Sequence, residues 1–98
     1  MPLIKKSRMK KRFQYTFSGY VQGVGFRYQA YRAANQLGLT GWARNEYDGS
    51  VTMEVQGEQD KIDTMLETIE NSPYISINRL KEKELPLQLD KKRFEICN

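Results

Sequence analysis

Residues 13–38, FQYTFSGYVQGVGFRYQAYRAANQLG, change from one hydrophobic period to another. Aromatic residues alternate with polar ones over 13–17, the pattern of a half-buried strand, which we expect to end near Tyr20. Two glycines within 22–25 interrupt this strand, and apolar residues then recur at helical spacing until Gly38, a typical helix stop. The stretch therefore predicts a strand, a glycine-rich loop and a helix.

Beyond this stretch, the same reasoning predicts further elements, and Gly57 is expected to break the strand pattern that precedes it. They are strands over 39–45 and 51–56, a helix that ends before Pro73, a strand within 74–84 and a short strand around 94–96. The resulting order is βαββαβ with a terminal strand.

This order folds most simply as an α+β, ferredoxin-like split βαβ sandwich, in which an antiparallel sheet carries two helices on one face and a short C-terminal strand. The first two strands of such a unit run parallel, with the third strand between them. Their C-terminal ends therefore share one edge of the sheet. We expect the loop 22–25 and Asn45 to lie roughly 10 Å apart there, because that is two strand spacings.

The loop and the helix that follows it have the chemistry of a phosphate cradle. Glycine accepts positive φ, so the backbone can approach a ligand and direct several N–H groups at an anion. The helix N-terminus adds partial positive charge, and an arginine adds a planar fork of donors. Asn45 can hold a water beside the anion, because its amide both donates and accepts. The expected phosphate-binding loop comprises Gln22, Gly23, Val24, Gly25, Phe26 and Arg27, with Arg27 and Asn45 as the candidate catalytic residues.

Each of these residues also has an ordinary structural explanation. A Gly-x-Gly between a strand and a helix is, by itself, most often a turn. Arg27 alone would be read as a surface charge, and Asn45 alone as a turn former before residues 46–49. Their expected convergence at one sheet edge favours a binding site.

Other phosphate and nucleic-acid sites do not fit the residues. Gly23-Val-Gly25 lacks the third glycine of a dinucleotide loop, and no Gly-Lys-Ser/Thr follows for a nucleotide P-loop. An RNA-recognition domain needs aromatic residues on the exposed face of its third strand, where this chain has Thr52, Glu54 and Gln56. We therefore expect no nucleotide site and no RNA-recognition surface.

The composition limits the class of protein further. Cys97 is the only cysteine and histidine is absent, so neither an internal disulfide nor the usual zinc ligand sets can form. No run approaches the roughly 18 apolar residues of a membrane span. We expect a cytoplasmic protein that requires neither metal nor cofactor and does not enter a membrane.

The net charge of +4 is unevenly distributed. The first twelve residues contain six Lys and Arg and no acid, whereas ten basic residues face twelve acidic ones from Phe13 onward. We expect residues 1–11 to be a flexible basic tail and residues 12–98 to be the folded domain. Such a tail is usually solvated, and the alternative is a contact with phosphate, RNA or an anionic surface.

At the candidate site the sequence resembles the acylphosphatase family. Residues 19–27, GYVQGVGFR, and residues 41–51, GWARNEYDGSV, resemble its two signatures in the usual order and separation, and the similarity extends from Phe13 to Ile96. The resemblance implies that Arg27 and the loop amides bind a phosphoryl group and that Asn45 orients the attacking water.

The resemblance also implies an activity, the hydrolysis of a small acyl phosphate to a carboxylate and inorganic phosphate. Inorganic phosphate would then be both product and inhibitor, and we expect a monomer. One alternative is a non-catalytic module of the same fold that binds anions or RNA. A second is a domain that serves carbamoyl phosphate in a larger maturation protein, although we expect these 98 residues to form a single domain.

Overall fold

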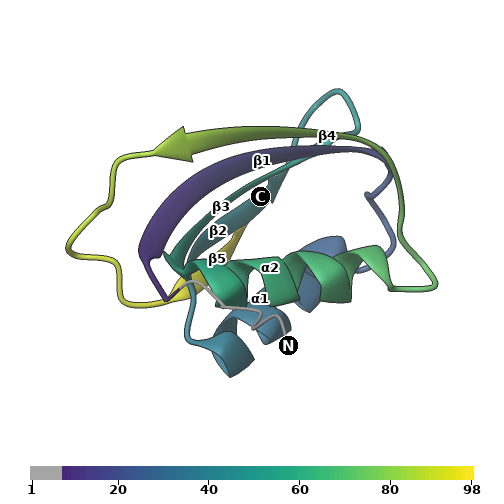
Figure 1. Ribbon diagram of the computed structural model, residues 1–98. Coiled ribbons are helices and arrows are strands. Elements are labelled where there is room, and N and C mark those ends of the chain that lie inside the picture. Colours follow the sequence, from purple (N-terminus) through teal and green to yellow (C-terminus); the bar gives the residue numbers. More distant parts are fainter. Residues whose placement is uncertain (1–7) are drawn as a thin grey trace, which may run out of the picture.

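The computed structural model describes residues 8–98, and seven helices and strands form within them (Figure 1). In chain order they are β1 (Lys10–Tyr20), α1 (Phe26–Leu37), β2 (Thr40–Asn45), β3 (Val51–Glu58), α2 (Gln59–Glu70), β4 (Ser76–Leu85) and β5 (Phe94–Cys97). This is the order expected from the sequence.

All described strands join one sheet in the order β4-β1-β3-β2-β5, and α1 and α2 lie side by side on one face (Figure 1). Strand β3 is antiparallel to both β1 and β2, so β1 and β2 run parallel with β3 between them. The ferredoxin-like sandwich is therefore confirmed. The sheet is mixed rather than wholly antiparallel, because β5 pairs parallel to β2.

Strand β1 begins before the boundary expected for the tail. Lys10 and Lys11 pair with Glu58 and Gly57 of β3, and the ammonium of Lys11 lies 3.5 Å from a carboxylate oxygen of Glu84. Backbone pairing does not require apolar side chains, so the lysine-rich composition did not reveal this start. Lys10 and Lys11, which we expected in the tail, therefore belong to the sheet, and residues 1–7 lie outside the described part.

Gly57 does not break β3, which continues to Glu58. A Cβ atom at Gly57 would lie 2.4 Å from the Leu39 side chain, so a glycine here makes room for a packed neighbour. The periodicity of the sequence carries no information about such a close approach, and the expectation of a break was wrong.

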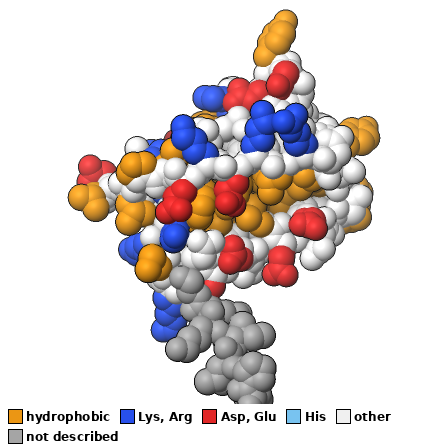
Figure 2. Space-filling model, turned by 45° about the horizontal axis from the view of Figure 1, so that its top comes forward, with side chains coloured by type: hydrophobic (Ala, Val, Ile, Leu, Met, Phe, Trp, Pro, Cys, Tyr) orange, Lys and Arg blue, Asp and Glu red, His pale blue; other side chains and the backbone are white. Residues whose placement is uncertain are grey.

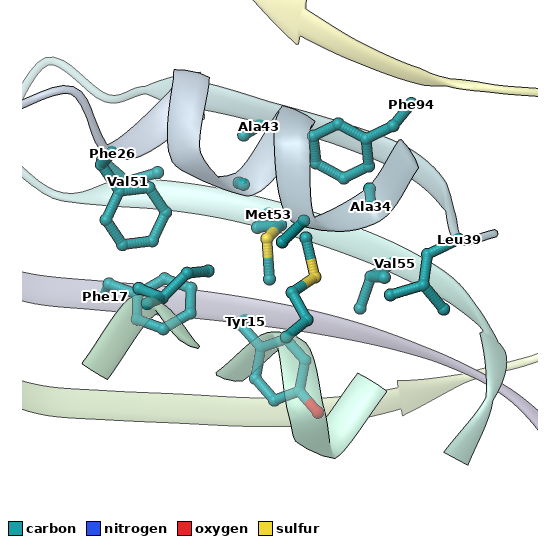
Figure 3. Packing of buried hydrophobic residues seen from close by; sticks show 14 of the residues in the cluster. Tyr15, Phe17, Phe26, Ala34, Leu39, Ala43, Val51, Met53, Val55 and Phe94 are labelled. Carbon is teal, nitrogen blue, oxygen red and sulfur yellow. The ribbon is translucent and has the colours of Figure 1, made fainter. Parts of the chain in front are cut away.

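The core lies between the helices and the inner face of the sheet (Figure 3). The aromatic side chains expected from the alternating pattern of β1 are buried there, and the rings of Phe17 and Phe26 lie 4.7 Å apart between centroids. Phe26 begins α1, so this contact fixes the start of that helix against the end of β1. Burial, together with the nearby carboxylate of Glu82, raises the pKa of Tyr15 above its usual range.

The outer face of the sheet is polar and tightly connected. Arg12 forms an ion pair with Glu54 in the next strand and also donates to the carbonyl oxygen of Pro86 at 3.2 Å. Thr52, expected on an exposed surface, is buried. These contacts use the polar groups of β3 within the protein, and this strand presents no aromatic stacking surface.

Apolar side chains also gather in a groove between α2 and β4, with both basic and acidic side chains around it (Figure 2). Its volume is about 450 Å³, and its apolar lining is Phe17, Leu66, Ile75, Ile77 and Leu80. The groove shares no residue with the candidate site. No helix in residues 8–98 is long and apolar enough to cross a membrane.

Candidate active site

A pocket of about 160 Å³ lies where the C-terminal ends of β1 and β2 meet the start of α1. It joins segments that are distant in sequence, as the predicted topology requires. Its lining residues are Val21, Gly23, Gly25, Phe26, Arg27, Tyr28, Asn45 and Ile96. Among them only Arg27 carries a charge, so the pocket is positive and has no carboxylate in its lining.

The two loop glycines have the conformation that the cradle requires. Their φ angles are 73° at Gly23 and 80° at Gly25, in the left-handed region that strains other residues. A Cβ atom at either position would meet no other atom within 4 Å. The backbone here is therefore open to a ligand.

The first turn of α1 faces the loop without a competing side chain. Gly25 is the N-cap, no side chain caps the helix, and its first turn contains no acidic residue. The first N–H groups of a helix have no intrahelical acceptor and carry partial positive charge. They are available to an anion bound beside the loop.

Two residues of the predicted loop do not line the pocket. Gln22 turns to the β2–β3 turn, where its Nε2 donates to the carbonyl oxygens of Glu46 at 2.7 Å and Ser50 at 2.9 Å. Val24 packs against the core. The side chains of Gln22 and Val24 therefore hold the loop in place.

Arg27 is half-buried, and its Nη1 donates to the carbonyl oxygen of Cys97 at 2.8 Å. The acceptor belongs to β5, and the bond fixes the Nη1 group of the guanidinium beside the pocket. No sequence pattern indicates this bond, because a backbone carbonyl can belong to any residue. Four of the five guanidinium N–H groups remain for other partners.

Asn45 is the last residue of β2 and pairs with Val51, whose side chain is buried in the core. Alternate residues of a strand share a face, so Asn45 lies on the helix side of the sheet with Ala43. There it lines the same pocket as Arg27. The expected convergence of the loop, Arg27 and Asn45 is what the structure shows.

The turn after Asn45 is held by its own polar groups. The Ser50 hydroxyl and N–H both donate to Asp48, which lowers the pKa of that carboxyl. Hydrogen bonds from Thr52 and Arg44 lower the pKa of Glu46. Both carboxylates are engaged outside the pocket, so they leave its positive charge uncompensated.

Within residues 8–98, no three His, Cys, Asp or Glu side chains are grouped so that they could hold a metal ion. The polar groups of the pocket-lining residues are instead backbone amides, one guanidinium, one carboxamide and the hydroxyl of Tyr28. This set of groups suits the binding of an anion together with a water molecule.

The family model for acylphosphatase matches residues 13–96. The chain belongs to the acylphosphatase family. An acylphosphatase from Oceanobacillus iheyensis is 41% identical over 80 residues, which are 80% of this chain and 88% of that protein. The crystal structure of the acylphosphatase from Bacillus subtilis superposes with a TM-score of 0.82 at 30% identity, over 92% of this chain and all of that one.

The same domain also occurs inside a larger protein. Full-length HypF, solved in a phosphate- and nucleotide-bound form, matches with a TM-score of 0.82 at 27% identity, over 92% of this acylphosphatase but 12% of HypF. The curated relatives are themselves named acylphosphatases and match over most of their length. They support the hydrolase over the non-catalytic module.

This acylphosphatase is an acid-anhydride hydrolase (EC 3.6.1.7) that acts on small-molecule acyl phosphates. Family membership establishes this activity but does not assign roles to individual side chains.

Proposed function

We propose that Arg27 and the amides of the loop 22–27 bind the phosphoryl group and that Asn45 orients the attacking water. The observation that carries this proposal is the shared pocket, to which α1 contributes Arg27 and β2 contributes Asn45. An anion placed against the loop lies beside the guanidinium, and the carboxamide is then free to hold a neutral water.

The reaction needs little from the protein beyond binding and orientation. Water attacks phosphorus, the bond from phosphorus to the bridging oxygen breaks, and the acyl group leaves as a carboxylate. A carboxylate with a pKa of about 4 departs without protonation, so no general acid is required. The phosphate itself, whose second pKa is about 6, takes the proton of the attacking water.

Charge stabilisation is then the main task of the site. The fixed guanidinium and the oriented amides meet the charge on the equatorial phosphoryl oxygens, and they reorganise little during the reaction. The bond from Arg27 to Cys97 supports this role, because it orients the fork before substrate arrives. Attack by water means that no covalent intermediate with the enzyme forms.

We further propose that hydrolysis needs no metal, that the enzyme is a cytoplasmic monomer, and that residues 1–8 take no part in catalysis. Benzoyl phosphate hydrolysis, measured with and without chelator, tests the first point. Loss of activity on chelation and its recovery with a divalent ion would contradict the mechanism. Size-exclusion chromatography with light scattering tests the oligomeric state.

The roles of the two side chains are separated by measuring kcat and phosphate affinity on the same folded variants. Asn45→Ala should lower kcat by roughly 100-fold or more and leave phosphate affinity nearly unchanged, because orienting water matters in the transition state. Asn45→Asp should do no better, since it adds negative charge beside a dianion. Equal losses in kcat and affinity would make Asn45 a ligand or a structural residue.

Arg27→Lys is the complementary variant. A compact ammonium cannot reproduce a planar fork held by Cys97, so we expect both phosphate affinity and kcat to fall. Near-normal activity in this variant would place the anion site elsewhere.

A further inference from the structure

The pocket is smaller than the sites that usually enclose a whole organic ligand. Sites that enclose small organic ligands usually have volumes of roughly 300–1,000 Å³, whereas this pocket has about 160 Å³. In the proposed function the phosphoryl group lies against the loop, at the inner end of this space. The acyl group, joined to phosphorus through one bridging oxygen, must therefore extend to the mouth of the pocket.

The apolar lining residues divide into two sets by exposure. Val21 and Phe26 are 1% and 2% exposed and belong to the core. Tyr28 and Ile96 are 58% and 44% exposed although both line the pocket. Single exposed apolar residues are ordinary on a protein surface, but these two come from different elements and meet at one pocket. We call this pair the acyl shelf.

Neighbouring side chains restrain the ring of Tyr28. The guanidinium carbon of Arg32 lies 5.9 Å from its ring centroid, and the ring of Tyr31 stacks at 6.5 Å with an interplanar angle of 24°. Cation–π and stacking contacts of this kind favour one orientation of an exposed ring. The ring is therefore oriented before a ligand arrives.

Ile96 is placed by β5, next to the residue that holds the side chain of Arg27. It pairs with Ala43 of β2, and the next residue, Cys97, accepts the hydrogen bond of Arg27. The acyl shelf and Arg27 are thus parts of one local structure, and a ligand held by Arg27 presents its other end to the acyl shelf.

We propose that Tyr28 and Ile96 form an acyl-binding subsite that favours aromatic or branched apolar acyl groups. This proposal rests on the proposed function, in which the phosphoryl group occupies the loop. In that arrangement Arg27 and the amides serve phosphate and Asn45 serves water. Apart from the Tyr28 hydroxyl, the remaining side-chain surface at the mouth is apolar, and it offers a small polar acyl group less contact than an aromatic or branched one.

The test compares benzoyl phosphate with acetyl phosphate in wild type, Tyr28→Ala and Ile96→Ala. For each substrate, kcat/KM of the variant is divided by kcat/KM of wild type, and this ratio cancels the difference in intrinsic reactivity between the two substrates. Loss of the shelf contact should lower kcat/KM for benzoyl phosphate about 10-fold, mainly through KM, because the contact is made equally in the ground and transition states. Acetyl phosphate should change less than about twofold.

Binding is measured separately with phosphonates that cannot be hydrolysed. Benzylphosphonate should inhibit wild type more tightly than methylphosphonate does, and Tyr28→Ala should remove the difference while inhibition by inorganic phosphate stays the same. Tyr74→Ala is the matched control, because Tyr74 is 71% exposed and does not line the pocket. It should leave every ratio unchanged.

Three outcomes would overturn the subsite. Equal loss on benzoyl and acetyl phosphate would make Tyr28 a structural residue. Unchanged ratios in both variants would show that the acyl group lies elsewhere. Tighter binding of methylphosphonate than of benzylphosphonate by wild type would show that the mouth excludes apolar groups. If wild type hydrolyses neither substrate, the proposed function fails rather than the subsite.

Discussion

The replacement Gln22→Ala tests whether the phosphate loop is positioned by its tether to the β2–β3 turn. Gln22 donates to two backbone carbonyls, of Glu46 at 2.7 Å and of Ser50 at 2.9 Å. A hydrogen bond contributes a net 0.5–1.5 kcal/mol, so losing both should cost about 2 kcal/mol of the free energy of unfolding. For a domain of this size that lowers Tm by roughly 10 °C.

The tether also connects the loop to the segment that follows Asn45. If it sets the relative position of the loop and Asn45, its loss should lower kcat about 10- to 100-fold, since small displacements of reacting groups are costly. Gln22→Glu should be at least as harmful, because a carboxylate cannot donate to a carbonyl and adds charge near phosphate. Thermal unfolding and steady-state kinetics on the same preparations measure both effects.

Gln56→Ala is the matched control for this experiment. Gln56 donates to the carbonyl oxygen of Gln88 at 2.7 Å and accepts from its N–H at 2.7 Å, on the outer face of the sheet. Removal of these bonds should reduce stability without changing kcat. A destabilised Gln22→Ala enzyme with normal kcat would refute the positioning role, and an unchanged Tm would refute the contribution of the two bonds.

Three further predictions follow from the geometry. Gly25→Val and Gly38→Val impose similar backbone strain at φ values of 80° and 70°, and each should cost about 1–3 kcal/mol of the free energy of unfolding. Only Gly25→Val should also abolish phosphate binding. Normal activity in Gly25→Val would contradict the proposal that the loop binds phosphate. Deletion of residues 1–8 should leave kcat and Tm unchanged. Deletion of residues 1–11 should lower Tm, because it removes the first strand pairs of β1. An unchanged Tm in the longer deletion would contradict that pairing. The lowered pKa of Glu46 contributes stability that is present at neutral pH and lost as the pH falls through the carboxyl range. Thr52→Val should therefore have a lower urea midpoint of unfolding than wild type at neutral pH, and the same midpoint as wild type at roughly pH 3. A difference in midpoint that does not depend on pH would contradict this linkage.

The strands, the helices and their order were predictable, because they follow from the spacing of hydrophobic residues along the sequence. The alternation over 13–17 places the aromatic side chains in the core, and the order of elements leaves few topologies. The convergence of Arg27 and Asn45 in one pocket follows from that topology, because parallel strands end at one sheet edge. Their chemical roles remain predictions.

The parts that were missed depend on contacts that leave no pattern in the sequence. Gly57 is needed because Leu39 packs against it, and the strand continues through it. The sequence places Gln22 in the loop but cannot show which way its side chain turns. The partner of Arg27 is a backbone carbonyl 70 residues away. Packing distance and side-chain direction, rather than residue type, decide each of these.

The hydrogen bond between Arg27 and Cys97 makes the site depend on the edge of the sheet. Strand β5 has four residues, and among the strands of residues 8–98 it pairs with β2 alone; its one buried residue is Phe94. Short edge elements open at a lower free-energy cost than a core does. If β5 detaches, Arg27 loses its acceptor and Ile96 leaves the pocket. With the role proposed for Arg27, activity should then be lost at a lower denaturant concentration than the one that unfolds the rest of the sheet.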